Sequence, residues 1–113
     1  MSIVNRNNAR HYKWGNDCDG WLLCHNEKLS VIEEVVPPGS YEERHYHQNS
    51  EQFFYVLSGA ATIELDGIVH LVSANNGLHI PSKSPHKLSN EGNENLCFIV
   101  VSTPPSHEDK VKA

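Results

Sequence analysis

Short apolar runs separated by turn-forming residues recur along the chain and predict an all-β domain. Apolar and β-branched side chains fill residues 29–36, 52–57 and 96–101, and each run has the length of a strand rather than of a helix. The first run stops at Pro37-Pro38-Gly39, a turn signal. No segment shows a convincing helical period, so we expect a sandwich or closed barrel of short strands with little or no helix.

A hairpin is predicted in the middle of the chain. Apolar and polar residues alternate over 61–65, Asp66-Gly67 follows, and a second strand pattern occupies 68–72. Asp-Gly supplies the two positive-φ positions of a tight two-residue turn. This turn would pair His70 with a position near Ile63.

The length of 113 residues and the composition indicate one barrel with a flanking segment on each side. We assign 29–103 to the barrel. Residues 1–28 contain Tyr12, Trp14 and Trp21, too apolar for a disordered arm, and we expect them to form strands that pack on the barrel or on a partner subunit. Residues 104–113 are a polar C-terminal tail, expected to be loosely held unless its two prolines turn it back along the sheet.

The net charge and the cysteines indicate which partners and which cellular compartment to expect. The net charge is -5 with acids and bases interspersed, so no basic patch indicates nucleic acid. No run of about 18 apolar residues indicates a membrane span, and residues 1–8 lack the apolar stretch of a secretory signal. The three cysteines, Cys18, Cys24 and Cys97, are odd in number and show no CxxC spacing, which favours a reducing compartment. We therefore expect a cytoplasmic protein.

His45-Tyr46-His47, followed by His86, is the strongest chemical signal. Side chains at i and i+2 of a strand share one face and lie about 6.6 Å apart along its axis, so two imidazoles can converge on one point. Imidazole nitrogen is the commonest metal ligand near neutral pH. An isolated HxH pair is more often two surface histidines, so the surrounding sequence must decide between these interpretations.

That surrounding sequence resembles a known family. Residues 39–59 read GSYEERHYHQNSEQFFYVLSG and resemble the first motif of the cupins, and residues 75–90, NNGLHIPSKSPHKLSN, resemble the second. The resemblance, to small single-domain cupins of the cupin-2 type, implies a cupin jelly-roll barrel (double-stranded β-helix). It also implies one divalent metal ion on His45, His47 and His86. The fold does not fix the activity, because cupins include dioxygenases, isomerases, epimerases, storage proteins and sensors.

One departure from the family pattern concerns the fourth ligand. The family usually places a glutamate where this chain has Gln52, and its own glutamate stands one residue earlier, at Glu51. If Gln52, Phe54 and Val56 share the inward face of a strand, Glu51 points outward. Gln52 is the favoured ligand, and a local bulge that turns Glu51 inward is the alternative. Neutral ligands leave Zn, Fe, Ni, Co, Mn and Cu all open.

A second departure lies in the other motif, where Asn75 and Lys83 replace the usual glycines. Asparagine tolerates a left-handed backbone, so a turn at Asn75 remains plausible. The Lys83 ammonium either lies at a solvated turn, which we favour, or reaches the mouth of the barrel. We assign it no role.

The expected pocket is largely apolar, with Phe54 and Val56 facing it and His79 as a further candidate that otherwise lies satisfied against the backbone. Two classes of function fit. The first is a metal-dependent enzyme, a dioxygenase or a sugar-isomerase-like or epimerase-like cupin, and the second is a non-catalytic metabolite-binding or sensing module. In both the partner is a small molecule, and no catalytic residue is assigned. We also expect a homodimer, since exposed sheet edges invite pairing.

Overall fold

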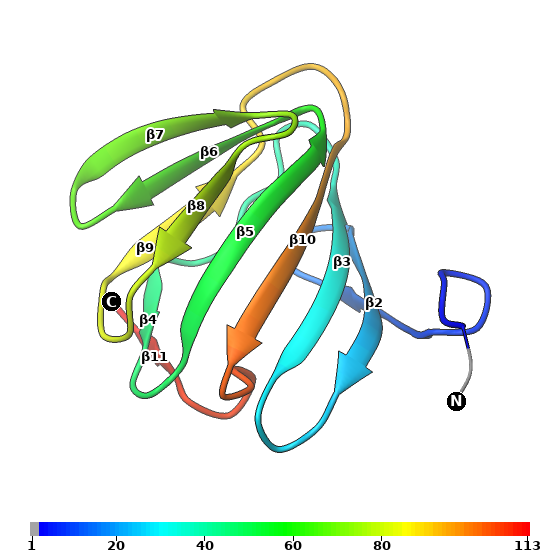
Figure 1. The fold of residues 1–113 in the computed structure, drawn as a ribbon. Coiled ribbons are helices and arrows are strands. Elements are labelled where there is room, and N and C mark those ends of the chain that lie inside the picture. Colours follow the sequence, from blue (N-terminus) through cyan, green and yellow to red (C-terminus); the bar gives the residue numbers. More distant parts are fainter. Residues whose placement is uncertain (1–2) are drawn as a thin grey trace.

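The computed structural model describes residues 3–113 and shows strands packed into two antiparallel sheets (Figure 1). In chain order the strands are β1 (Arg10–Trp14), β2 (Cys18–His25), β3 (Ser30–Val36), β4 (His45–His47), β5 (Glu51–Ser58), β6 (Ala60–Leu65), β7 (Ile68–Ser73), β8 (Gly77–Ile80), β9 (His86–Ser89), β10 (Leu96–Thr103) and β11 (Lys110–Lys112). Residues 3–113 include no helix, which confirms the predicted all-β class. Accordingly, no helix in this range is long and apolar enough to cross a membrane.

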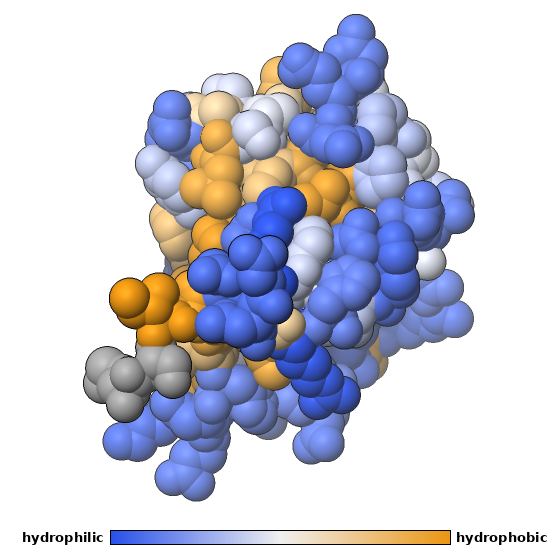
Figure 2. Space-filling view, turned by 90° about the vertical axis from the view of Figure 1, so that its right-hand side faces the viewer, coloured by the Kyte–Doolittle hydropathy of each residue, from blue (hydrophilic) through white to orange (hydrophobic). Residues whose placement is uncertain are grey.

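The two sheets face each other and enclose the core as a jelly roll. One sheet has the order β1-β2-β3-β10-β5-β8, and the other has the order β11-β4-β9-β6-β7. Strands distant in sequence are therefore neighbours, as Figure 1 shows for β3, β10 and β5. The side that carries the N-terminal segment presents mostly hydrophilic side chains, with small apolar groups between them (Figure 2).

Alternation of buried with more exposed residues in β5 and β10 builds the interior. In β5 the side chains of Gln52, Phe54 and Val56 are buried, while those between them are exposed. Phe54 packs against Phe98 of β10 with ring centroids 5.3 Å apart. Strands β5 and β10 pair with each other, and near one end of this pairing Gln52 lies opposite Ser102. The interior is thus apolar in its middle and polar near one end, where the candidate site lies.

The predicted hairpin forms between β6 and β7. Asp66 and Gly67 have φ values of 50° and 87°, and Leu65 pairs with Ile68 across the turn. Ile63 pairs with His70, as the two-residue turn requires. Asn75 also adopts positive φ, 68°, as expected for a residue that replaces a turn glycine.

Both flanking segments join the sheets. Residues 10–25 supply β1 and β2, which extend the six-stranded sheet beyond β3. At the other end β11 pairs with β4 in the five-stranded sheet. The C-terminal segment is therefore turned back along the sheet rather than loosely held, and its partner strand is the one that carries His45 and His47.

Candidate metal centre

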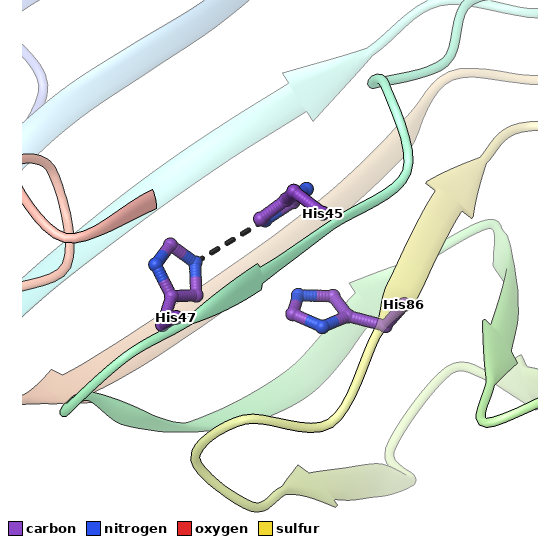
Figure 3. Close-up of side chains that lie close together, drawn as sticks. All are labelled: His45, His47 and His86. Atoms are coloured by element: carbon purple, nitrogen blue, oxygen red, sulfur yellow. Dashed lines mark hydrogen bonds between the residues drawn. The ribbon is translucent and has the colours of Figure 1, made fainter. Parts of the chain in front are cut away.

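Three buried imidazole rings converge inside the barrel (Figure 3). His45 and His47 project from the same face of β4, and His86 at the start of β9 pairs directly with His45. Their exposed fractions are 3 %, 5 % and 1 %. One nitrogen of each ring lies within 4.8 Å of those of the other two. The i, i+2 spacing thus brings the two rings together as the sequence suggested, and the neighbouring strand adds the third.

Hydrogen bonds on the far side of each ring fix its tautomer. Every Nδ1 atom contacts an oxygen that can only accept, so each Nδ1 carries the ring proton. The accepting atoms are Glu43 O at 2.8 Å from His45, Asp109 Oδ1 at 2.9 Å from His47, and Ser84 O at 2.9 Å from His86. The three Nε2 atoms are therefore left with bare lone pairs. An Nδ1–H bonded to a carbonyl or carboxylate oxygen is the usual outer contact of a metal-bound histidine.

The Nε2 atoms of His45 and His47 lie only 3.2 Å apart (dashed line in Figure 3). A hydrogen bond between them would need a second proton on one ring. Burial opposes that, because it lowers the pKa of His45 to about 3 and also lowers the pKa values of His47 and His86. Two facing lone pairs repel each other, and a cation between them removes that repulsion.

Gln52 adds an amide oxygen to the same interior. Its side chain is 7 % exposed, and its Nε2 atom donates a hydrogen bond to Ser102 Oγ at 3.0 Å. Gln52 Oε1 and His86 Nε2 are the two buried side-chain atoms in residues 3–113 without a hydrogen-bond partner. Buried polar atoms are rarely left unpaired. These two unpaired acceptors, together with the bare Nε2 atoms of His45 and His47, fit a divalent cation.

Glu51 lies on the other side of β5. Its side chain is exposed, and its carboxylate is 3.8 Å from Nε2 of His79 on the outer surface. No bulge turns it inward, and Gln52 alone of the two enters the barrel. His79 is likewise exposed and does not face the cavity, so its inclusion among the pocket residues was wrong.

Asp109 contacts a candidate metal ligand, and the sequence did not indicate it. Besides accepting from His47, its carboxylate accepts hydrogen bonds from the backbone N–H groups of Asn49 and Ser50, at 2.9 and 2.8 Å. Burial acts to raise the pKa of Asp109, but these backbone hydrogen bonds and the one from His47 outweigh it and lower that pKa. An ionised Asp109 therefore holds both the His47 ring and the turn that follows β4.

A cavity of about 280 Å³ opens beside the histidines. His45, His47 and Gln52 line one part of it, and Phe54 lines another. Val56 is fully buried in the core but does not border this space. Further apolar wall comes from Trp14, Ile32, Leu88, Phe98 and Val100. The volume is at the lower end of the range of about 300–1,000 Å³ for ligand pockets, so it suits a small molecule.

Two carboxyl groups also face this cavity. Glu34 projects inward from β3, and Glu42 precedes β4 on the opposite sheet. Burial raises the pKa of Glu34 to about 8 and that of Glu42 to about 7. The sequence held a signal for the first, because adjacent glutamates at 33 and 34 of one strand must point to opposite faces.

Comparison with known proteins agrees with this architecture. The cupin domain family matches residues 32–102. The uncharacterized protein MJ1618 of Methanocaldococcus jannaschii is 41 % identical over 83 residues, 73 % of this chain and 66 % of that protein. Polyketide synthase CurC of Streptomyces cyaneus is 34 % identical over 70 residues, 62 % of this chain and 46 % of that protein. The chain thus spans less than two thirds of these curated relatives.

A solved structure extends the likeness to nearly the whole fold. KdgF from Halomonas sp. has a TM-score of 0.86 at 18 % identity, covering 96 % of this chain and 97 % of that one. At this identity the likeness concerns the fold alone. The family match over most of the chain is decisive, and the chain belongs to the cupin domain family.

Proposed function

We propose that this cupin binds one divalent metal ion through His45, His47, His86 and Gln52. The observation that carries the proposal is the set of three buried Nε2 atoms. Each has a free lone pair, because the Nδ1 atom of the same ring carries the proton and donates it to an oxygen acceptor. The unpartnered Oε1 atom of Gln52 supplies a fourth donor on the same cavity. Nitrogen-rich donor sets of this kind suit zinc and other borderline divalent ions.

We further propose that the bound ion acts on a small organic molecule held in the adjoining cavity. With three neutral imidazoles and a neutral amide, the ion keeps its full charge, and it would supply Lewis-acid chemistry to an oxygen atom of that molecule. This donor set lacks the carboxylate of the two-histidine, one-carboxylate iron oxygenases. We therefore favour Lewis-acid chemistry over dioxygenation, which is one of the activities that the family resemblance implies.

Metal analysis tests the binding site. Protein purified without chelators or affinity-tag metals should contain about one divalent ion per chain, as a set of preformed deprotonated ligands requires. His47→Ala should lose the ion. His79→Ala is the matched control, because this exposed histidine lies outside the cavity and its loss should leave the metal content unchanged. Absence of metal from the wild-type protein after incubation with zinc, iron or nickel would contradict the proposal.

Two further measurements separate the classes of function. Oxygen uptake with candidate substrates that requires the metal would identify a dioxygenase and contradict the Lewis-acid proposal. A metabolite recovered unchanged from the purified protein, with no turnover of it, would identify a binding module.

A further inference from the structure

A tyrosine on the inward face of the six-stranded sheet reaches across a glycine to a carboxyl group. Tyr12 of β1 pairs with Gly20 of β2, and Gly20 pairs with Glu34 of β3. A Cβ atom at Gly20 would lie 2.5 Å from the Tyr12 ring, so the missing side chain leaves the space that this ring occupies. The Tyr12 hydroxyl lies 3.5 Å from Glu34 Oε2, as a long hydrogen-bond donor. This arrangement points Glu34 and Tyr12 into the cavity together.

A second carboxyl group faces the cavity from the other sheet. Glu42 Oε2 accepts a hydrogen bond from the backbone N–H of Leu88 at 3.1 Å, which fixes the side chain against β9. Glu42 and Glu34 border the same space as His45 and His47. An acid and a base placed on opposite walls of one pocket can both reach a molecule bound between them.

Near neutral pH the two carboxyl groups differ in protonation state. Burial and the nearby Glu42 raise the pKa of Glu34 to about 8, so Glu34 keeps its proton. Burial raises the pKa of Glu42 to about 7, with Lys110 acting in the opposite direction, so Glu42 is partly ionised. The other titratable groups on the cavity wall are Tyr12, His45, His47, His107 and Lys110.

Further features show that this space is built for a ligand. Gln52, 7 % exposed, turns an unpartnered amide oxygen into the interior and borders the cavity, and His86 Nε2 is unpartnered as well. The aromatic side chains of Trp14, Phe54 and Phe98 make the walls apolar. A molecule that fits has an apolar body and an oxygen atom directed at the metal centre.

We propose that Glu34 and Glu42 are the acid–base pair of this cavity, and that its substrate is an uncharged carbonyl compound with an apolar body. This inference rests on the proposed function, because the carbonyl oxygen is placed at the metal-binding end. Two carboxyl groups and the lone cation Lys110 give little to hold a phosphorylated sugar.

The reaction is a proton transfer that changes no oxidation state overall. The Glu42 carboxylate takes a proton from the carbon beside the carbonyl group. The electron pair of that C–H bond forms a C=C bond, and the carbonyl π pair moves onto oxygen. Glu34 gives its proton to that oxygen or to another carbon of the conjugated system, which yields an isomer. Transfer of a proton from Glu42 to Glu34 restores the starting state, and no oxidant or reductant is consumed.

The test compares Glu34→Gln and Glu42→Gln with Glu33→Gln in the full metal-loaded chain. Glu33 is the matched control because it lies on the same strand and faces outward. The probes are acetophenone and cyclohexanone in D2O, with exchange of the hydrogens beside the carbonyl followed by NMR. A second readout is the 13C titration of glutamate carboxyl carbons, recorded with and without metal.

With Glu34→Gln and with Glu42→Gln, the hydrogens beside the carbonyl group of the probes should exchange about 10²–10⁴-fold more slowly than with wild type. This is the effect expected for loss of a general acid or base. Bound metal per chain should stay unchanged, and the Glu33→Gln protein should match wild type. Two carboxyl signals should titrate above about pH 6, and each variant should remove one of them.

Wild-type exchange no faster than that of the free ion in buffer would overturn the inference, as would variants at the wild-type rate or carboxyl groups titrating at ordinary values. Failure of the wild-type chain to hold metal would instead contradict the proposed function. The titration needs no metal, so it would still show whether the pKa values of Glu34 and Glu42 are raised.

Discussion

Asp109 Oδ1 accepts a hydrogen bond from His47 Nδ1 at 2.9 Å, and this contact joins two residues 62 positions apart. It ties the C-terminal segment to a candidate metal ligand. It also fixes the proton of His47 on Nδ1, which leaves Nε2 free to bind a metal ion.

Removal of this contact should weaken metal binding without removing a ligand. Asp109→Ala should lower metal affinity about 10–100-fold, the usual effect of losing an outer hydrogen-bond partner of a metal-bound histidine. Competition with a chromogenic chelator measures the affinity. Glu108→Ala is the control, since this neighbouring side chain is exposed. Equal affinities for the two variants would show that Asp109 does not orient His47.

The fourth ligand is tested by changing its charge and its donor atom. Gln52→Leu removes the amide oxygen and should weaken metal binding. Gln52→Glu adds a carboxylate beside the ion and should strengthen it, because an anionic ligand offsets the charge of the ion. Isothermal titration calorimetry with zinc measures the metal affinity of both variants. Unchanged affinity in both variants would remove Gln52 from the ligand set.

The partly buried Glu34 should make the protein less stable at alkaline pH. Its pKa is about 8 in the folded state against 4.5 for an ordinary glutamate, so between these values the folded chain binds more protons than the unfolded chain. Stability from this group is therefore fully present below about pH 4.5 and is lost as the pH rises towards 8. Glu42 acts with the same sign up to about pH 7.

Thermal melting between pH 7 and 8.5 isolates this effect. The buried histidines, whose pKa values are lowered, act with the opposite sign, and their effect fades above about pH 6.5 as histidines of the unfolded chain lose their protons. The melting temperature of the wild-type protein should fall across this window, and that of Glu34→Gln should fall less. A parallel decline in both proteins would contradict the assignment of a raised pKa to Glu34.

Self-association is expected through the outer face of β5. Phe53 and Tyr55 are 43 % and 38 % exposed there, and their rings stack with centroids 6.5 Å apart. Apolar side chains on an exposed sheet face favour an interface. We predict a homodimer by size-exclusion chromatography with light scattering at micromolar concentration. Phe53→Glu should give the mass of one chain, whereas Leu71→Ser on β7 should not, and a one-chain mass for the wild-type protein would contradict the prediction.

The sequence predicted those parts of the site that depend on local spacing. The inward face of β5 and the convergence of His45 and His47 follow from the two-residue period of a strand. The same period requires the adjacent Glu33 and Glu34 to point to opposite faces of β3. It could not show which of them enters the barrel, because that choice depends on the pairing of β3 with β10, whose residues are far away in the chain.

Residues brought in by long-range pairing were missed for the same reason. Asp109 reaches His47 only because β11 pairs with β4, and no periodic pattern in residues 104–113 indicates that pairing. Tyr12 reaches Glu34 only because Gly20 lies between them in the sheet. His79 was misplaced because its strand alternation leaves it opposite Phe53, on the outer face.

The central claim is that three bare Nε2 atoms share one ion, and anomalous diffraction from crystals of metal-loaded protein tests it most directly. Data collected on both sides of the absorption edge of the metal should show one peak per chain, about 2.0–2.3 Å from Nε2 of His45, His47 and His86. A peak at another place, or no peak among these rings, would contradict the account.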